Sequence, residues 1–106
     1  MPVVPSGIVN QRQLATAIRK AADALAPEVV RIRYALTIDS VGSEAIFFRV
    51  LLSDRASRPG RLYETTERIT AKILGIVQPQ ERFGMEAYFN FRSESEQAKL
   101  REPAWE

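Results

Sequence analysis

Residues 29–52 have the sequence VVRIRYALTI-DSVGSE-AIFFRVLL, and this stretch decides the fold. Apolar and polar side chains alternate with period two at both of its ends, as on strands with one buried face. The predicted inward residues are Val30, Ile32, Tyr34, Leu36 and Ile38 on the first strand, and Ile46, Phe48, Val50 and Leu52 on the second. Asp39 to Glu44 consists of turn-forming residues, and Gly42 can adopt a positive φ. The pattern therefore predicts an antiparallel β-hairpin.

Helical periodicity flanks this hairpin on both sides. Asn10 and Gln13 form a variant of the capping box, and apolar residues then recur at spacings of three and four as far as Ala26, before Pro27. A second helix is predicted from about Leu62 to Val77, closed by Pro79. Its expected inward residues are Leu62, Ile69, Ile73, Ile76 and Val77.

Alternation returns from Phe83 to Arg92, which predicts a third strand. Ser93 and Glu96 then form a capping box for a short helix that continues to about Arg101. We therefore predict an α+β fold with the order α-β-β-α-β: a two-layer sandwich of a three-stranded sheet with two helices on one face, and a short C-terminal helix. Residues 1–9 are a lead-in, 10–92 a single domain and 93–106 a C-terminal helical tail. The sequence leaves open whether the third strand lies beside the first or the second.

The residue composition excludes several classes of function. There is no cysteine and no histidine, which removes disulfides, thiolate nucleophiles, Cys/His zinc sites and Ser-His-Asp triads. The three aspartates are scattered, and no glycine-rich phosphate loop occurs. The formal charge of +2 is too small to imply nucleic-acid or membrane binding. We expect a protein that is not an enzyme, has no cofactor and no metal, does not bind membranes, and by elimination is cytoplasmic.

Arginines and aromatic rings alternate onto the strand face opposite the helices. The expected sheet-face binding residues are Arg31, Arg33, Phe47, Arg49, Leu51, Tyr88 and Arg92. Three interpretations remain open: a surface for a protein partner or a second copy, a face that solvent or the chain's own C-terminal residues cover, and a surface for single-stranded nucleic acid.

Two further groups of residues are candidates for binding. Arg55, Arg58 and Arg61 lie in a loop at the front of the second helix, where orphan N–H groups and the helix dipole attract anions. A solvated loop is the alternative. Leu100 and Trp105 form either a docking motif for another subunit or a contact with the chain's own core.

Two resemblances to known families bear on function. Across about residues 10–92, the α-β-β-α-β order resembles ribosome-binding factor A and the N-terminal domain of ribosome maturation factor P, which implies KH-like RNA binding. The segments AIFFRVLLSD (45–54) and YFNFRSESEQ (88–97) resemble a small uncharacterised bacterial family associated with gene pairs that encode a HEPN-type partner. This second resemblance implies an antitoxin-like regulatory protein.

The sequence thus favours a non-catalytic protein–protein interaction or regulatory module, antitoxin-like, that binds a protein partner or its own copy through the open sheet face. The alternative is a KH-like RNA-binding protein of the ribosome-maturation type.

Overall fold

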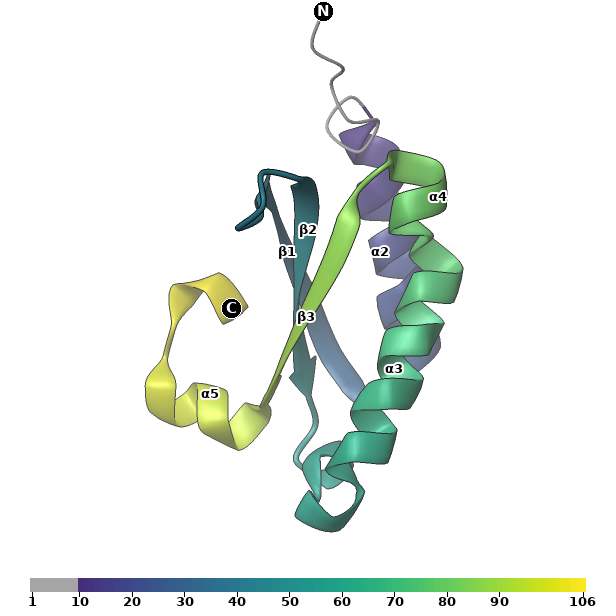
Figure 1. The fold of residues 1–106 in the computed structure, drawn as a ribbon. Coiled ribbons are helices and arrows are strands. Elements are labelled where there is room, and N and C mark those ends of the chain that lie inside the picture. The colour runs from purple at the N-terminus through teal and green to yellow at the C-terminus, as the bar shows by residue number, and fades with distance from the viewer. Residues whose placement is uncertain (1–9) are drawn as a thin grey trace, which may run out of the picture.

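A three-stranded sheet stands between two long helices on one side and the C-terminal segment on the other (Figure 1). The computed structural model describes residues 10–106, so the lead-in predicted for residues 1–9 lies outside the described residues. The predicted α+β sandwich, with a three-stranded sheet and two helices on one face, is confirmed.

The predicted hairpin forms the first two strands of the sheet. β1 (Val29–Ile38) and β2 (Glu44–Leu52) pair antiparallel. The Oδ1 atom of Asp39 accepts the main-chain N–H groups of Val41 and Ser43 at 3.1 and 2.9 Å, and Gly42 has the expected positive φ of 84°. A short aspartate side chain and one flexible residue therefore close the turn.

The third strand, β3 (Glu86–Ser93), pairs parallel to β2, so the sheet order is β1-β2-β3. This settles the strand order that the sequence left open. The parallel direction follows from the connection, because the chain returns along the helix layer before it re-enters the sheet.

The helix layer consists of α2 (Gln11–Leu25) and α3 (Leu62–Val77), which pack against each other and cover one sheet face. Alternate β2 residues point into this layer, and Phe48 stacks there on Phe89 with ring centroids 4.8 Å apart. The fully buried core residues include Leu14, Ala21, Ile46, Phe48, Val50, Ile69, Ile73 and Val77. Burial of these side chains is the main stabilising term of the fold.

Several local predictions were wrong, among them the inward position of Ile38, which is 55% exposed. Asn10 precedes α2, but its side chain makes no cap hydrogen bond, so the capping box with Gln13 is not formed. A β-bulge between Val29 and Arg31 shifts the alternation by one residue, which buries Val29 and leaves Val30 44% exposed. Leu62 is also exposed, because it begins α3 directly after the short 3₁₀ turns η1 (Arg55–Ser57) and η2 (Pro59–Arg61), beyond the packed turns of the helix.

The segment between α3 and β3 also differs from the prediction. Gln78 ends α3 in the left-handed conformation (φ 51°). Pro79 does not only end α3, as predicted, but also begins an additional short helix, α4 (Pro79–Phe83). Phe83 is buried in α4 and is not part of the strand. The missing proline N–H costs nothing at the first helical position, which explains why the chain resumes a helix there.

The C-terminal segment consists of α5 (Glu94–Leu100) and the 3₁₀ turn η3 (Pro103–Trp105). The predicted capping box is present: Glu96 N–H donates to Ser93 Oγ at 3.1 Å, and Ser93 N–H donates to Glu96 Oε1 at 3.2 Å. The chain then folds back over the sheet face that the helices leave open (Figure 1). Among residues 10–106 we find no helix with the length and apolarity that crossing a membrane requires.

Candidate functional site

The sheet face opposite the helices is ordered in rows by the strand register. All seven predicted sheet-face residues lie on it, because residues directly opposite one another on paired strands point to the same side. The three rows are Ala35–Phe47–Tyr88, Arg33–Arg49–Asn90 and Arg31–Leu51–Arg92.

The chain's own C-terminal segment covers the third row. Trp105 is only 6% exposed, and its ring lies 4.4 Å from the guanidinium carbon of Arg92. The Arg31 Nε–H donates to the main-chain oxygen of Trp105 at 3.3 Å, and Leu51 is 4% exposed. Leu51 and Trp105 are therefore buried and cannot contact a partner in this conformation. Of the two predicted docking residues in the tail, only Leu100 remains exposed.

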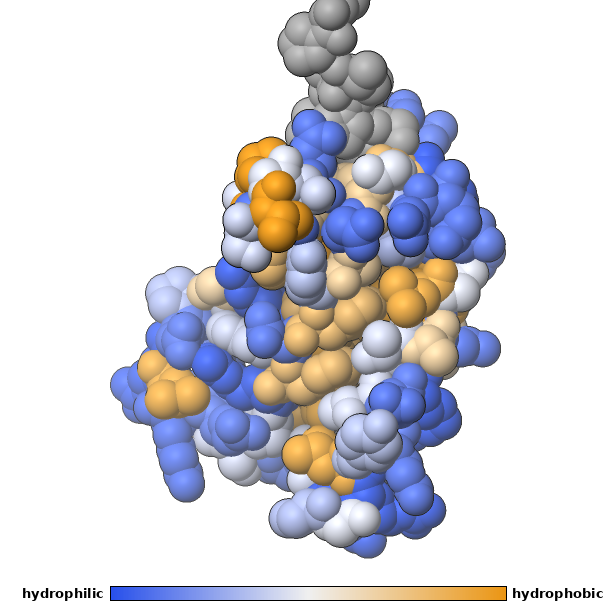
Figure 2. Space-filling model, in the orientation of Figure 1, coloured by the Kyte–Doolittle hydropathy of each residue, from blue (hydrophilic) through white to orange (hydrophobic). Residues whose placement is uncertain are grey.

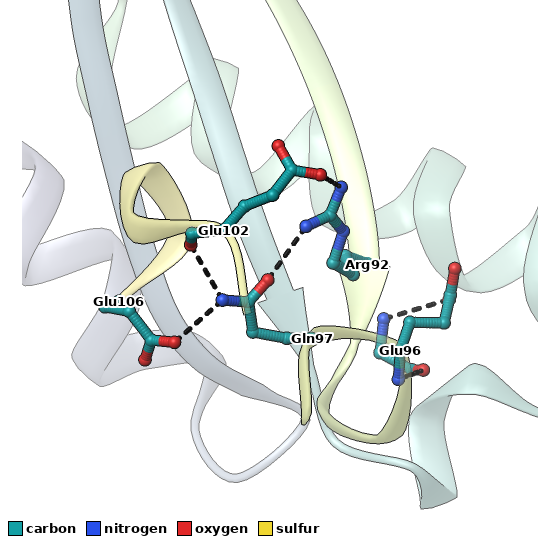
Figure 3. A network of polar contacts seen from close by, with 6 residues as sticks. Arg92, Glu96, Gln97, Glu102 and Glu106 are labelled. Atoms are coloured by element: carbon teal, nitrogen blue, oxygen red, sulfur yellow. Dashed lines mark hydrogen bonds and ion pairs between the residues drawn. The ribbon is translucent and has the colours of Figure 1, made fainter. Parts of the chain in front are cut away.

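A buried amide holds this covering segment in place (Figure 3). The Gln97 Oε1 atom accepts a hydrogen bond from Arg92 Nη1 at 2.8 Å. Its Nε2 group donates to the main-chain oxygen of Glu102 and to Glu106 Oε1, both at 2.8 Å. Arg92 also forms an ion pair with Glu102 at 2.8 Å. Every polar atom of the amide is thus used, which offsets the cost of burying it.

Sequence reasoning missed Gln97. The signal that could have found it is weak: it occupies the inward position of a short, polar helix, where an apolar residue is expected. Its role depends on three residues of the covering segment and β3 that only the folded chain brings together.

The first two rows stay partly open. Phe47 and Tyr88 stack across the strands, with ring centroids 4.9 Å apart and planes 17° from parallel. The Tyr88 hydroxyl donates to Asp39 Oδ2 at 2.8 Å. This bond, together with the Ser43 N–H, lowers the pKa of the Asp39 carboxyl, and the same bond raises the pKa of the Tyr88 phenol. The turn and the edge strand are therefore linked, and the ring pair is held in one orientation.

Arg49 lies at the centre of this open area. It is half-buried, and the register places Arg33 directly opposite it on β1 and Asn90 on β3. The Arg33 Nε–H donates to the main-chain oxygen of Glu106. Arg49 itself has no hydrogen-bond or ion-pair partner among residues 10–106. The register thus sets two arginines directly opposite each other, and like charges at such positions form an unfavourable cross-strand pair.

The arginine loop forms a second surface at one end of α3. Arg55, Arg58 and Arg61 line a groove of about 740 Å³, and no other described residue within 10–106 binds their side chains. Arg68 lines it too, but both of its terminal nitrogens donate to Glu28, at 2.9 and 2.6 Å. These bonds lower the pKa of the Glu28 carboxyl. The loop arginines are thus gathered in one groove, and anion binding there stays a prediction.

Within residues 10–106 we find no group of three acidic side chains able to hold a metal ion. Comparison with protein-family models, with curated proteins and with solved structures returned no match for this chain. The two family resemblances therefore stay predictions.

Proposed function

We propose that this chain is a non-catalytic binding module that holds a protein partner through Phe47, Arg49 and Tyr88, the part of the sheet face that the tail leaves open, with Arg33, which also binds Glu106, at its border. The observation that carries this proposal is that Arg49, at the centre of this area, has no hydrogen-bond or ion-pair partner among residues 10–106. A half-buried guanidinium without a partner, facing a second arginine, gains free energy when a carboxylate approaches it. The expected partner therefore presents an Asp or Glu side chain to the centre of the sheet.

The surroundings of Arg49 fit this role. Tyrosine and arginine are enriched among the residues that dominate interface energetics. Here they stand on a regular sheet, and the hydrogen bond to Asp39 holds Tyr88 in place. A pre-ordered surface loses little conformational entropy when it binds.

RNA binding through the same face is the alternative function. The Arg55–Arg61 groove and the open outer face of Tyr88 favour it, because single strands bind arginines and stack on rings. The stacking of Phe47 on Tyr88 favours a protein instead, since each ring already has one face covered by the other. In addition, only Gln78 separates α3 from α4, with no G-x-x-G loop of the kind that KH domains use to clamp nucleotides. The resemblance to a family paired with HEPN-type partners makes antitoxin-like regulation the finer form of the proposal.

An Arg49→Ala variant tests the proposal, with Arg19→Ala on the exposed surface of α2 as the matched control. Immobilised wild-type and variant chains are exposed to a nuclease-treated extract, the captured proteins are compared, and the affinity of a captured protein is then measured in purified form. We expect Arg49→Ala to weaken that affinity about tenfold or more, and Arg19→Ala to leave it unchanged. Equal binding by all three chains, or no captured protein, would refute the proposal.

The salt dependence of the binding affinity distinguishes the two functions. An RNA complex weakens steeply between low and high salt, because each neutralised phosphate releases counterions. A protein complex centred on one arginine and two rings depends on salt far less. Binding that appears only with RNA and falls steeply with salt would replace the proposed function by its alternative.

A further inference from the structure

The outer edge of β3 is open and lacks the devices that usually protect sheet edges. β3 is the last strand in the order β1-β2-β3, and its pairing with β2 runs without a bulge from Glu86 to Ser93. The segment EAYFNFRS contains no proline and no lysine. The opposite edge, β1, carries the bulge at Val29, which twists an edge away from further pairing. An unprotected edge of this length presents free N–H and C=O groups to another strand.

Apolar surface borders this edge on the helix side. Phe89 and Phe91 are only partly buried where β3 leaves the core. Beside them, Phe91 forms a groove of about 280 Å³ with Thr66, Thr70 and Leu74, which follow one another at a spacing of four along α3. Figure 2 shows the apolar surface running down the middle of this face, over β3 and along α3. A contiguous apolar band beside an open edge is typical of a protein interface.

The residues of β3 are complementary to those of a second β3 that runs antiparallel to it. A two-fold axis through Phe89 and perpendicular to the sheet keeps both sets of helices on one side, because opposite residues then point to the same face. The pairs are Glu86 with Arg92, Ala87 with Phe91, Tyr88 with Asn90, and Phe89 with its own copy. At both ends Glu86 stands opposite Arg92, whose guanidinium already binds Gln97 and Glu102 within its own chain, while apolar residues meet on the helix side.

We infer that a second copy of this chain pairs with the open edge of β3, giving a symmetric dimer in which the two sheets form one continuous sheet. The α3 helices of the two copies then lie side by side, and the grooves at Leu74 close on each other. The Arg49 surface of each copy stays open and faces the same side as that of the other copy. This interface is separate from the sheet-face site of the proposed function.

Charge reversal at Glu86 tests the dimer without disturbing the fold. Glu86 is exposed and makes no hydrogen bond or ion pair within residues 10–106, so Glu86→Lys leaves the monomer intact. In the dimer it places a lysine, a residue that opposes edge pairing, at both ends of the β3–β3 seam. Asp23→Lys, on the exposed surface of α2, is the matched control. By analytical ultracentrifugation we expect a dimer for the wild type and the control, and a dissociation constant raised about tenfold or more for Glu86→Lys.

Cross-linking gives a positive test of the register. The chain has no cysteine, so Asn90→Cys introduces a single thiol. In the inferred register the two Asn90 positions are diagonal neighbours, about 7–8 Å apart. A short bis-maleimide should therefore link Asn90→Cys into covalent dimers but not Ala24→Cys on α2. A monomeric wild type at micromolar concentration, a dimer that Glu86→Lys leaves unchanged, a dimer that Arg49→Ala dissolves instead, or no cross-link at residue 90 would each overturn the inference.

Discussion

Replacement of Trp105 by alanine should release the C-terminal segment from the sheet at a modest cost in stability. Burying a tryptophan removes about 200 Å² of surface from water, which stabilises the docked segment by about 5 kcal/mol. The contact with the Arg92 guanidinium adds about 1 kcal/mol. Ordering Pro103–Glu106 costs about 4–5 kcal/mol in conformational entropy. The balance predicts that Trp105→Ala lowers the free energy of unfolding by about 1–2 kcal/mol, because the segment then undocks and the loss cannot exceed its net docking free energy.

Urea denaturation followed by far-ultraviolet circular dichroism measures this change. Trp105 is the chain's single tryptophan, so the wild type reports docking independently through its fluorescence. Arg92→Met should shift that emission to longer wavelength by removing the cation and freeing Gln97. A loss below a few tenths of a kcal/mol for Trp105→Ala would show that the segment does not dock. A loss above about 4 kcal/mol would place Trp105 in the main core and would equally refute the reasoning.

Three smaller perturbations test the local interactions. Ser93→Ala removes the N-cap of α5 and should cost about 1 kcal/mol in denaturant unfolding, whereas an unchanged midpoint would mean that the cap is not formed in solution. Arg68→Met should cost less than 1 kcal/mol, because its ion pair with Glu28 is exposed on both sides; a larger loss in thermal unfolding would contradict this. The pKa of Asp39 lies below its ordinary value because of the Tyr88 hydroxyl, so its contribution to stability is present above the unfolded-state pKa and is lost as the pH falls through the folded-state pKa. Tyr88→Phe should raise that pKa in an NMR titration, and a pKa that does not move would exclude the bond.

Periodicity correctly assigned side chains to faces in β2 and predicted the bounds of α3. The alternation in 45–52 placed every second β2 residue on the correct face, and the bounds of α3 agree with the predicted Leu62–Val77. The capping box at Ser93 was found because two side chains and two backbone groups within four residues determine it. The Ser93 box depends only on neighbours in sequence, which a local pattern can reveal, although the similar pattern at Asn10 and Gln13 did not form.

The remaining differences depend on contacts between distant segments. The bulge at Val29 lies where the start of β1 pairs with the end of β2. The alternation of residues within one strand carries no information about that pairing. Arg68 has Glu64 one helical turn away but binds Glu28, because the bidentate geometry is available only across the fold. The covering of Arg31, Leu51 and Arg92 likewise requires the position of the last four residues in space. The sequence could therefore predict which residues share the sheet face, but not which of them stay accessible.

The parallel pairing of β2 with β3 has a consequence for the order in which the molecule assembles. The β1–β2 hairpin closes across a short turn, whereas β3 pairs with β2 only after the whole helical connection has been brought back. Loop-closure entropy therefore places β3 among the last elements to join the nucleus. A nascent chain that has not yet emerged beyond Gly84 would carry the hairpin and both long helices with one side of β2 bare. Until β3 has been synthesised, the bare side of β2 is where aggregation or chaperone binding would begin.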